Sequence, residues 1–149
     1  MTAEKSVVFL DANVLLYYLD GSSLQHAQTE DTLSHFIEIG AALCASHHAL
    51  EEVLHVTLQV FGVEAVNDAL GDISKIPGLY LLEPIADFAF ARRYTKLLES
   101  VNVGLNDCLL LQLMLDNDIT HLYTYDEKLA RATNTLNISN ITNNINSPL

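Results

Sequence analysis

The stretch Val7-Val8-Phe9-Leu10-Asp11-Ala12-Asn13 decides the fold, because it joins a short apolar run directly to a carboxylate. Four consecutive apolar residues after a polar lead predict a strand that is buried on both faces, as in a parallel sheet covered by helices. Asp11 then stands at the carboxyl end of this strand, where the crevice of such a sheet lies. The opening of the chain therefore predicts an α/β domain with a polar site at one edge of its sheet.

The rest of the chain continues this alternation of short apolar runs and helical segments. Further strands are predicted at residues 41–45, 79–82 and 122–125. Helices are predicted at residues 13–20, 25–39, 47–61, 64–75, 85–99, 105–116 and 127–132. Short strands that alternate with helices predict a central, mostly parallel sheet of four to five short strands with helices on both faces.

One domain of ordinary size accounts for this pattern, and no repeat or linker divides it. We assign residues 1–132 to the domain. Residues 133–149 are rich in Asn and Thr and are expected to form a polar C-terminal segment, with one last short strand near Ile138 and then a flexible tail.

Composition indicates in which cellular compartment the protein acts. No apolar run reaches the roughly 18–20 residues that a membrane span requires, and the N-terminal residues do not have the pattern of a signal peptide. Cys44 and Cys108 each lie in an apolar segment and are interpreted as small core residues. The chain is therefore expected to act in a reducing cytoplasm, without contact with a membrane.

Net charge argues against a simple nucleic-acid binder. The chain carries 19 acidic residues against 7 basic ones, a net charge of −12, whereas phosphate binding normally demands a basic surface. Five of the seven cations lie in the second half of the chain: Arg92, Arg93, Lys96, Lys128 and Arg131. Bound divalent cations would also cancel part of the acidity.

Four carboxylates, Asp11, Glu52, Asp107 and Asp126, lie at the ends of apolar segments or within one. A carboxylate beside a core is costly unless it is paired, hydrogen-bonded or bound to a metal. Each has a simpler alternative, because the three aspartates could cap the helices that follow them and Glu52 could be a solvated helix residue. The helical wheel also does not choose between Glu51 and Glu52.

Asp107 is the hardest of the four to explain by capping. The helix that it opens is apolar nearly all round, and such a helix is buried. Neither Asn106 nor Cys108 supplies a charge to pair with it. With few cations near any of the four acids, the set as a whole indicates a site for a hard metal ion and points towards phosphodiester chemistry.

Four stretches then carry a resemblance to a known family. They are FLDANVLL at 9–16, SHHALEEVL at 46–54, GLNDCLLL at 104–111 and HLYTYDEKL at 121–129. In this order they resemble the four motifs of PIN-domain ribonucleases, and the small single-domain layout is similar to the VapC-like toxin type. The resemblance covers residues 7–132, and the register of its second motif selects Glu52 over Glu51.

This resemblance implies a three-layer α/β/α sandwich and a function. It implies an endoribonuclease that hydrolyses phosphodiester bonds of single-stranded RNA, leaving a 5′-phosphate and a 3′-hydroxyl. It implies Mg²⁺ or Mn²⁺ as cofactor, held by Asp11, Glu52, Asp107 and Asp126, with Asn13 and Thr124 holding the carboxylates or metal-bound waters. The VapC-like type further implies the toxin of a type II toxin–antitoxin pair, a small antitoxin protein as partner, and a homodimer.

The basic residues have two interpretations. Lys128 and Arg131 follow Asp126 on one helix, and Arg92, Arg93 and Lys96 cluster on the helix before Asp107. They are possible phosphate contacts, or they belong to solvated helix faces.

Four alternatives compete with the toxin nuclease. His48 with Glu52, or Glu51 with His55, could hold zinc together with Asp107. A haloacid-dehalogenase-like phosphatase would require a second aspartate where this chain has Asn13. The remaining alternatives keep the PIN fold: a catalytically weak binding or assembly module, or a nuclease of RNA processing that is no toxin.

Overall fold

A five-stranded sheet forms the centre of the molecule in the computed structural model, which describes residues 5–141. Its strands lie in the order β3-β2-β1-β4-β5, and every neighbouring pair is parallel. The strands are β1 Val7–Leu10, β2 Ala42–Ser46, β3 Leu79–Leu82, β4 His121–Tyr123 and β5 Ser139–Asn140. Because β1 is the middle strand, Asp11 stands at the centre of the sheet's carboxyl edge.

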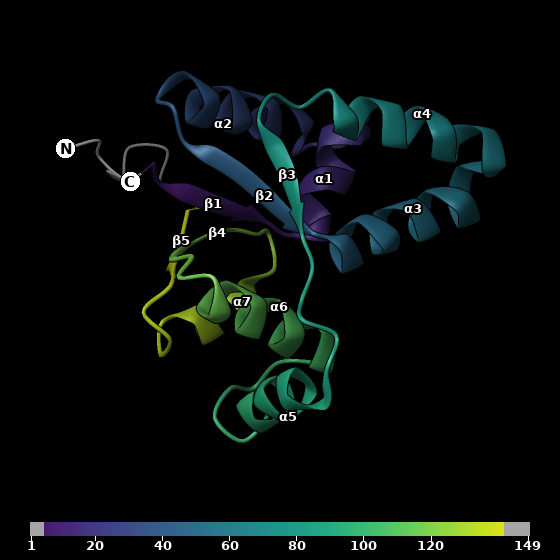
Figure 1. The fold of residues 1–149 in the computed structure, drawn as a ribbon. Coiled ribbons are helices and arrows are strands. Elements are labelled where there is room, and N and C mark those ends of the chain that lie inside the picture. The colour runs from purple at the N-terminus through teal and green to yellow at the C-terminus, as the bar shows by residue number, and fades with distance from the viewer. Residues whose placement is uncertain (1–4, 142–149) are drawn as a thin grey trace.

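Seven helices of the described residues cover the two faces of the sheet. They are α1 Ala12–Leu19, α2 His26–Glu38, α3 His47–Phe61, α4 Val63–Ser74, α5 Phe88–Leu97, α6 Leu105–Asp116 and α7 Glu127–Thr133. Figure 1 shows α1 to α4 on one side of the sheet and α5 to α7 on the other, with the α3–α4 pair extending beyond the strands. The predicted three-layer α/β/α sandwich with a parallel sheet is confirmed.

Strand β1 shows why its sequence is apolar at every position. Val8 and Leu10 pack into the core beneath α1 to α4, whereas Phe9 points into the core beneath α5 to α7, and all three are fully buried. Side chains alternate between the faces of a strand, so a strand covered on both faces has no polar position. In register, Phe9 lies between Cys44 of β2 and Leu122 of β4.

Most element ends differ from the predicted ones by one to three residues, and side-chain hydrogen bonds explain two of the differences. Helix α5 begins at Phe88 rather than at Ile85, because Asp87 caps it by accepting a hydrogen bond from the backbone N–H of Phe90 at 2.7 Å. Strand β4 ends at Tyr123 rather than at Tyr125, because the next backbone N–H groups bond to side chains instead of a neighbouring strand.

The C-terminal part bears on two further expectations. Strand β5 pairs with β4 and lies next to the position near Ile138 where a short strand is predicted. The flexible tail falls outside the described residues. Between residues 5 and 141, no helix combines the length and the apolar character that crossing a membrane requires.

Candidate functional site

All four predicted acids line one hollow of about 440 Å³ at the carboxyl edge of the sheet. Asp11 follows β1, and Asp126 precedes α7 three residues after the end of β4. Glu52 lies on α3, the helix after β2, and Asp107 lies in the first turn of α6. Four segments that are distant in sequence thus bring their carboxylates to a single place.

Three of these acids also cap helices. Asp11 Oδ1 accepts the backbone N–H of Ala12 at 2.8 Å, and Asp126 Oδ1 accepts that of Lys128 at 2.8 Å. Asp107 Oδ2 accepts the N–H of Gly104 at 3.3 Å and so closes the turn that opens α6. Capping and a place in the hollow are therefore compatible roles, since each cap fixes one oxygen and leaves the carboxylate at the edge of the sheet.

Asn13 and Thr124 fix the position of Asp11. Thr124 Oγ1 donates to Asp11 Oδ2 at 2.7 Å, and Asn13 Nδ2 donates to the same oxygen at 3.2 Å. The same two residues hold the loop that carries Asp126: Thr124 Oγ1 accepts the N–H of Asp126, and Asn13 Oδ1 accepts that of Tyr125. Both residues therefore connect the ends of β1 and β4.

The electrostatics of the hollow disfavour negative charge. The pKa of Asp11 is raised from 3.8 to about 6, mainly by burial and to a smaller extent by the nearby carboxylates of Asp107 and Glu52, while its hydrogen bonds lower it. Burial also raises the pKa of Asp107, where the charge of Asp126 adds to the effect and that of Lys128 opposes it. Charges held this close without a counter-ion repel one another.

No ion pair among residues 5–141 involves any of the four carboxylates. Carboxylate oxygens are the donors that Mg²⁺ and Mn²⁺ prefer, so the residues fit such an ion in kind. As the side chains stand, no three His, Cys, Asp or Glu groups in the described part of the chain converge closely enough to hold one ion. Glu52 and Asp126 are exposed, and exposed side chains have other rotamers open to them.

The side chains around Glu51 and Glu52 show which of the two belongs to the hollow. Glu52 lines the hollow, whereas Glu51 turns to His47 and His48, with N···O distances of 3.6 and 4.0 Å. His55 interacts with Gln59 through its Nε2 atom at 2.9 Å. No histidine is among the described residues that line the hollow, so the arrangement lends no support to a zinc site there.

The predicted phosphate contacts are dispersed. Lys128 lies close enough to Asp107 to affect the pKa of that carboxyl. Arg93 instead pairs with Asp116 at 2.8 Å, at the far end of α6 from Asp107. Arg92 and Lys96 are exposed on α5, Arg131 is exposed on α7, and none of the three lines the hollow.

The sequence alone assigns no role to Tyr125, which the structure places next to Asp126 on the loop between β4 and α7. Its hydroxyl lies 2.9 Å from that of Thr29 and 2.8 Å from that of Tyr123, and its ring packs edge-on against Tyr17. These contacts connect the Asp126 loop to α1 and α2. They depend on tertiary structure, and the only signal for them in the sequence is the density of tyrosines.

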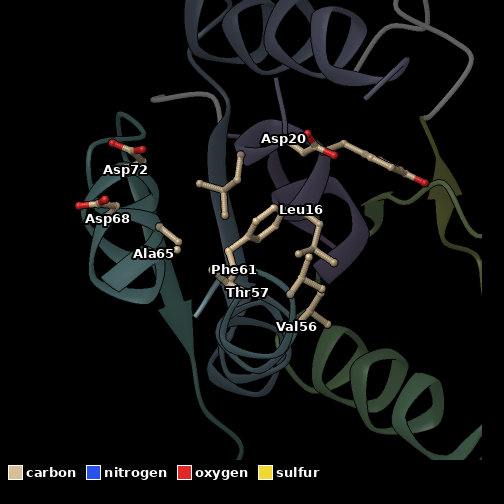
Figure 2. A pocket seen from close by; sticks show the side chains of 12 residues that line it. Leu16, Asp20, Val56, Thr57, Phe61, Ala65, Asp68 and Asp72 are labelled. Carbon is tan, nitrogen blue, oxygen red and sulfur yellow. The ribbon is translucent and has the colours of Figure 1, made fainter. Parts of the chain in front are cut away.

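A second hollow, of about 510 Å³, lies between α1, α3 and α4 and is shown in Figure 2. Its lining is mainly apolar, and Phe61 and Val60 are 68% and 64% exposed. Acidic residues line it as well: Asp20 at the end of α1 and Asp68 and Asp72 on α4. Leu16 lines both this hollow and the one that holds the four carboxylates, so the two lie next to each other on α1.

Comparisons with known proteins agree with this architecture. The family model of the PIN domain matches residues 8–134. Mycobacterium tuberculosis VapC20, described as a sarcin-ricin loop cleaving toxin, superposes with a TM-score of 0.66 at 13% identity, over 84% of this chain and 94% of its own. VapBC2 from Rickettsia felis, solved with a DNA fragment from its promoter, gives 0.63 at 16% identity, over 90% and 96%. No curated protein matches the chain.

Proposed function

The chain belongs to the PIN domain family, and from this premise we propose that it is a metal-dependent endoribonuclease acting on single-stranded RNA. The observation that carries the proposal is the hollow at the carboxyl edge of the sheet, which four carboxylates line without an ion pair from the described residues; we call it the acidic hollow. A divalent cation, and the phosphate that it binds, would offset the repulsion that this arrangement creates.

In this proposal Asp11, Glu52, Asp107 and Asp126 hold Mg²⁺ or Mn²⁺. The bound ion would supply a Lewis acid for the phosphate and a water of lowered pKa. Thr124 and Asn13 hold Asp11 in one orientation through its Oδ2 atom.

Asp126 and Lys128 have separate roles. The N-terminus of α7 fixes Asp126 Oδ1, and no hydrogen bond of the described residues reaches Asp126 Oδ2, which is available to a ligand. Lys128, near Asp107, supplies positive charge for a substrate phosphate.

Cleavage of a labelled single-stranded RNA tests this function. We expect Mg²⁺- or Mn²⁺-dependent cleavage by the unaltered protein, and a loss in Asp11→Asn and Asp107→Asn greater than the roughly 10–100-fold that loss of an outer-shell partner causes. Asp68→Asn on α4 is the matched control, because it removes one acid outside the acidic hollow. Circular dichroism checks that each variant is folded. Undiminished cleavage by Asp11→Asn would overturn the assignment.

We further propose that the chain is the toxin of a toxin–antitoxin pair and that a small antitoxin binds the hollow between α1, α3 and α4. Support comes from its exposed apolar residues Val60 and Phe61, and from the acids that line it, which suit an apolar segment flanked by basic residues. The similarity in fold to VapC toxins is consistent with this partner.

Calorimetry with the product of a neighbouring short reading frame tests the partner. Val60→Asp should weaken binding by at least tenfold, whereas Leu24→Ala, which removes an exposed apolar side chain elsewhere, should leave it unchanged. Equal affinities of the two variants would exclude this hollow as the binding place. A nuclease of RNA processing would cleave RNA and bind no such partner.

The net charge of −12 and the separation of the carboxylates favour one rival, an inert PIN-fold binding or assembly module. Metal titration separates the two functions, because an inert module should bind no Mn²⁺ specifically.

The homodimer and the cytoplasmic location that we expect are part of the toxin proposal. Light scattering after size exclusion tests the homodimer.

A further inference from the structure

A third hollow, of about 420 Å³, lies between α5 and the loop that follows β3. Ile85, Phe88, Phe90 and Tyr94 line it, together with Leu109 of α6. Phe88 is 82% exposed and Ile85 is 76% exposed. Exposed large apolar side chains that gather in one place mark a binding surface. The proposed catalytic residues do not use this hollow.

Helix α6 connects this hollow to the acidic one. Leu109 lines the apolar hollow, and Leu105, which is 49% exposed, lines the acidic hollow beside Asp107. Residues four apart lie on the same face of a helix, about 6 Å apart along its axis. A chain molecule bound at the carboxylates could therefore continue over α6 into the apolar hollow.

Cations accompany the exposed aromatic ring. Phe88, Arg92 and Lys96 follow one another at intervals of four on α5, so they form one exposed stripe, which we call the α5 stripe. No ion pair of the described residues involves Arg92 or Lys96, whereas Arg93, off the stripe, pairs with Asp116.

The charge distribution makes α5 distinctive within an acidic protein. Three of the seven lysine and arginine residues of the chain lie on this one helix. Asp87 is the acid that lines the apolar hollow, and its carboxylate accepts the backbone N–H of Phe90 at the positive end of α5.

We propose that the α5 stripe and the apolar hollow beside it bind the RNA strand next to the cleavage position. An unpaired base stacks on Phe88, and backbone phosphates contact Arg92 and Lys96. Aromatic rings combined with free cations are how proteins hold single strands without reading their sequence. A protein partner would need carboxylates of its own to pair with these two cations, whereas an RNA strand carries a phosphate at every nucleotide.

The inference rests on the proposed ribonuclease function, so the experiment measures both. Cleavage of RNA by the unaltered protein in Mn²⁺ reports the function. Fluorescence anisotropy with a labelled ten-nucleotide oligouridylate in EDTA reports binding without cleavage.

Phe88 is replaced by Ala, Leu and Trp to separate stacking from apolar contact. Stacking predicts that Phe88→Ala and Phe88→Leu both weaken binding, on the order of tenfold, and that Phe88→Trp preserves it. Leu98→Ala, at the end of the same helix and off the stripe, is the matched control and should bind normally. Because Phe88 is exposed, these variants are expected to fold.

The cations have a separate readout. The double variant Arg92→Ala, Lys96→Ala should reduce the slope of log Kd against log salt by about 1.4, since each phosphate contact on a single strand contributes about 0.7.

Three results would overturn the inference. Normal RNA binding by Phe88→Ala, in a protein that cleaves RNA, would show that the α5 surface does not bind RNA. The proposed ribonuclease function would stand. Dissociation of a dimer by Phe88→Ala, with unchanged RNA affinity, would assign the surface to protein contact. Absence of both cleavage and binding in the unaltered protein would remove the function and the inference together.

Discussion

At the scale of single residues, Asp11 is where folding and function compete. The folded protein buries this carboxyl beside two others, so its pKa rises from 3.8 to about 6. The folded state therefore holds the proton more tightly than the unfolded state does. The resulting penalty is absent below about pH 4, grows as the pH rises from about 4 to about 6, and is constant above that range. A shift of about two units corresponds to about 3 kcal/mol.

We predict that Asp11→Asn removes this pH dependence. Urea denaturation in EDTA should show the free energy of unfolding of the variant, minus that of the unaltered protein, rising by about 2–3 kcal/mol between pH 4 and pH 7. The offset at pH 4 reports altered hydrogen bonds with Thr124 and Asn13 and does not enter the test. Parallel curves over the whole range would show that Asp11 titrates normally in the folded state.

How far single residues could be predicted from the sequence depends on whether their environment is local. Asp11, Asp107 and Asp126 stand out as candidates because each lies at the start of a helix beside an apolar run, which the neighbouring residues alone reveal. Glu51 and Glu52 were not separable from the helical wheel. They differ in what surrounds them in three dimensions, since Glu51 faces histidines and Glu52 faces the hollow.

At the scale of elements, the junction of α3 and α4 depends on one glycine. Gly62 ends α3 and precedes α4 with φ at +88° and ψ at 178°, a conformation that is essentially restricted to glycine. Gly71 lies inside α4, where a Cβ atom would meet no neighbour within 4 Å. The same substitution should therefore have opposite effects at the two positions.

We predict that Gly62→Ala destabilises the protein by about 1–3 kcal/mol, because alanine is strained at this backbone conformation. Gly71→Ala should stabilise it by about 0.5–1 kcal/mol, because alanine favours the helix. Denaturant unfolding measures both. Similar changes of the same sign would mean that the α3–α4 junction does not hold this conformation.

The sequence predicted the middle of each element better than its ends. Helical periodicity extends back to Ile85, but the cap at Asp87 makes α5 begin at Phe88. The apolar run through Tyr125 suggests a longer β4, but Asn13 and Thr124 take the hydrogen bonds that would extend it. In both cases side-chain hydrogen bonds, which periodicity does not contain, decide the boundary.

At the scale of the whole molecule, the order of the strands assembles the site. Alternating strands and helices predicted a parallel α/β sandwich but not the order β3-β2-β1-β4-β5. That order places β1 between β2 and β4, so Asp11 lies between the segments that carry Glu52 and Asp126. Strand order follows from packing of the complete domain, so the meeting of these acids was a hypothesis from motifs rather than a result of periodicity.

The concentration of acids in one hollow leads to a last prediction about the whole fold. A ligand that binds only the folded state stabilises it, by about 2.7 kcal/mol when its free concentration is 100 times its Kd. For a domain of this size that corresponds to a rise in Tm of about 5–10 °C. We predict such a rise with saturating Mn²⁺ at pH 7.5, and a smaller one at pH 5, where a proton competes for Asp11.

Asp11→Asn and Asp107→Asn should lose most of the rise. Asp68→Asn should keep it, because the same change in net charge there leaves the hollow intact. An equal loss in all three variants would mean that Mn²⁺ acts through the overall charge of −12 rather than through one site.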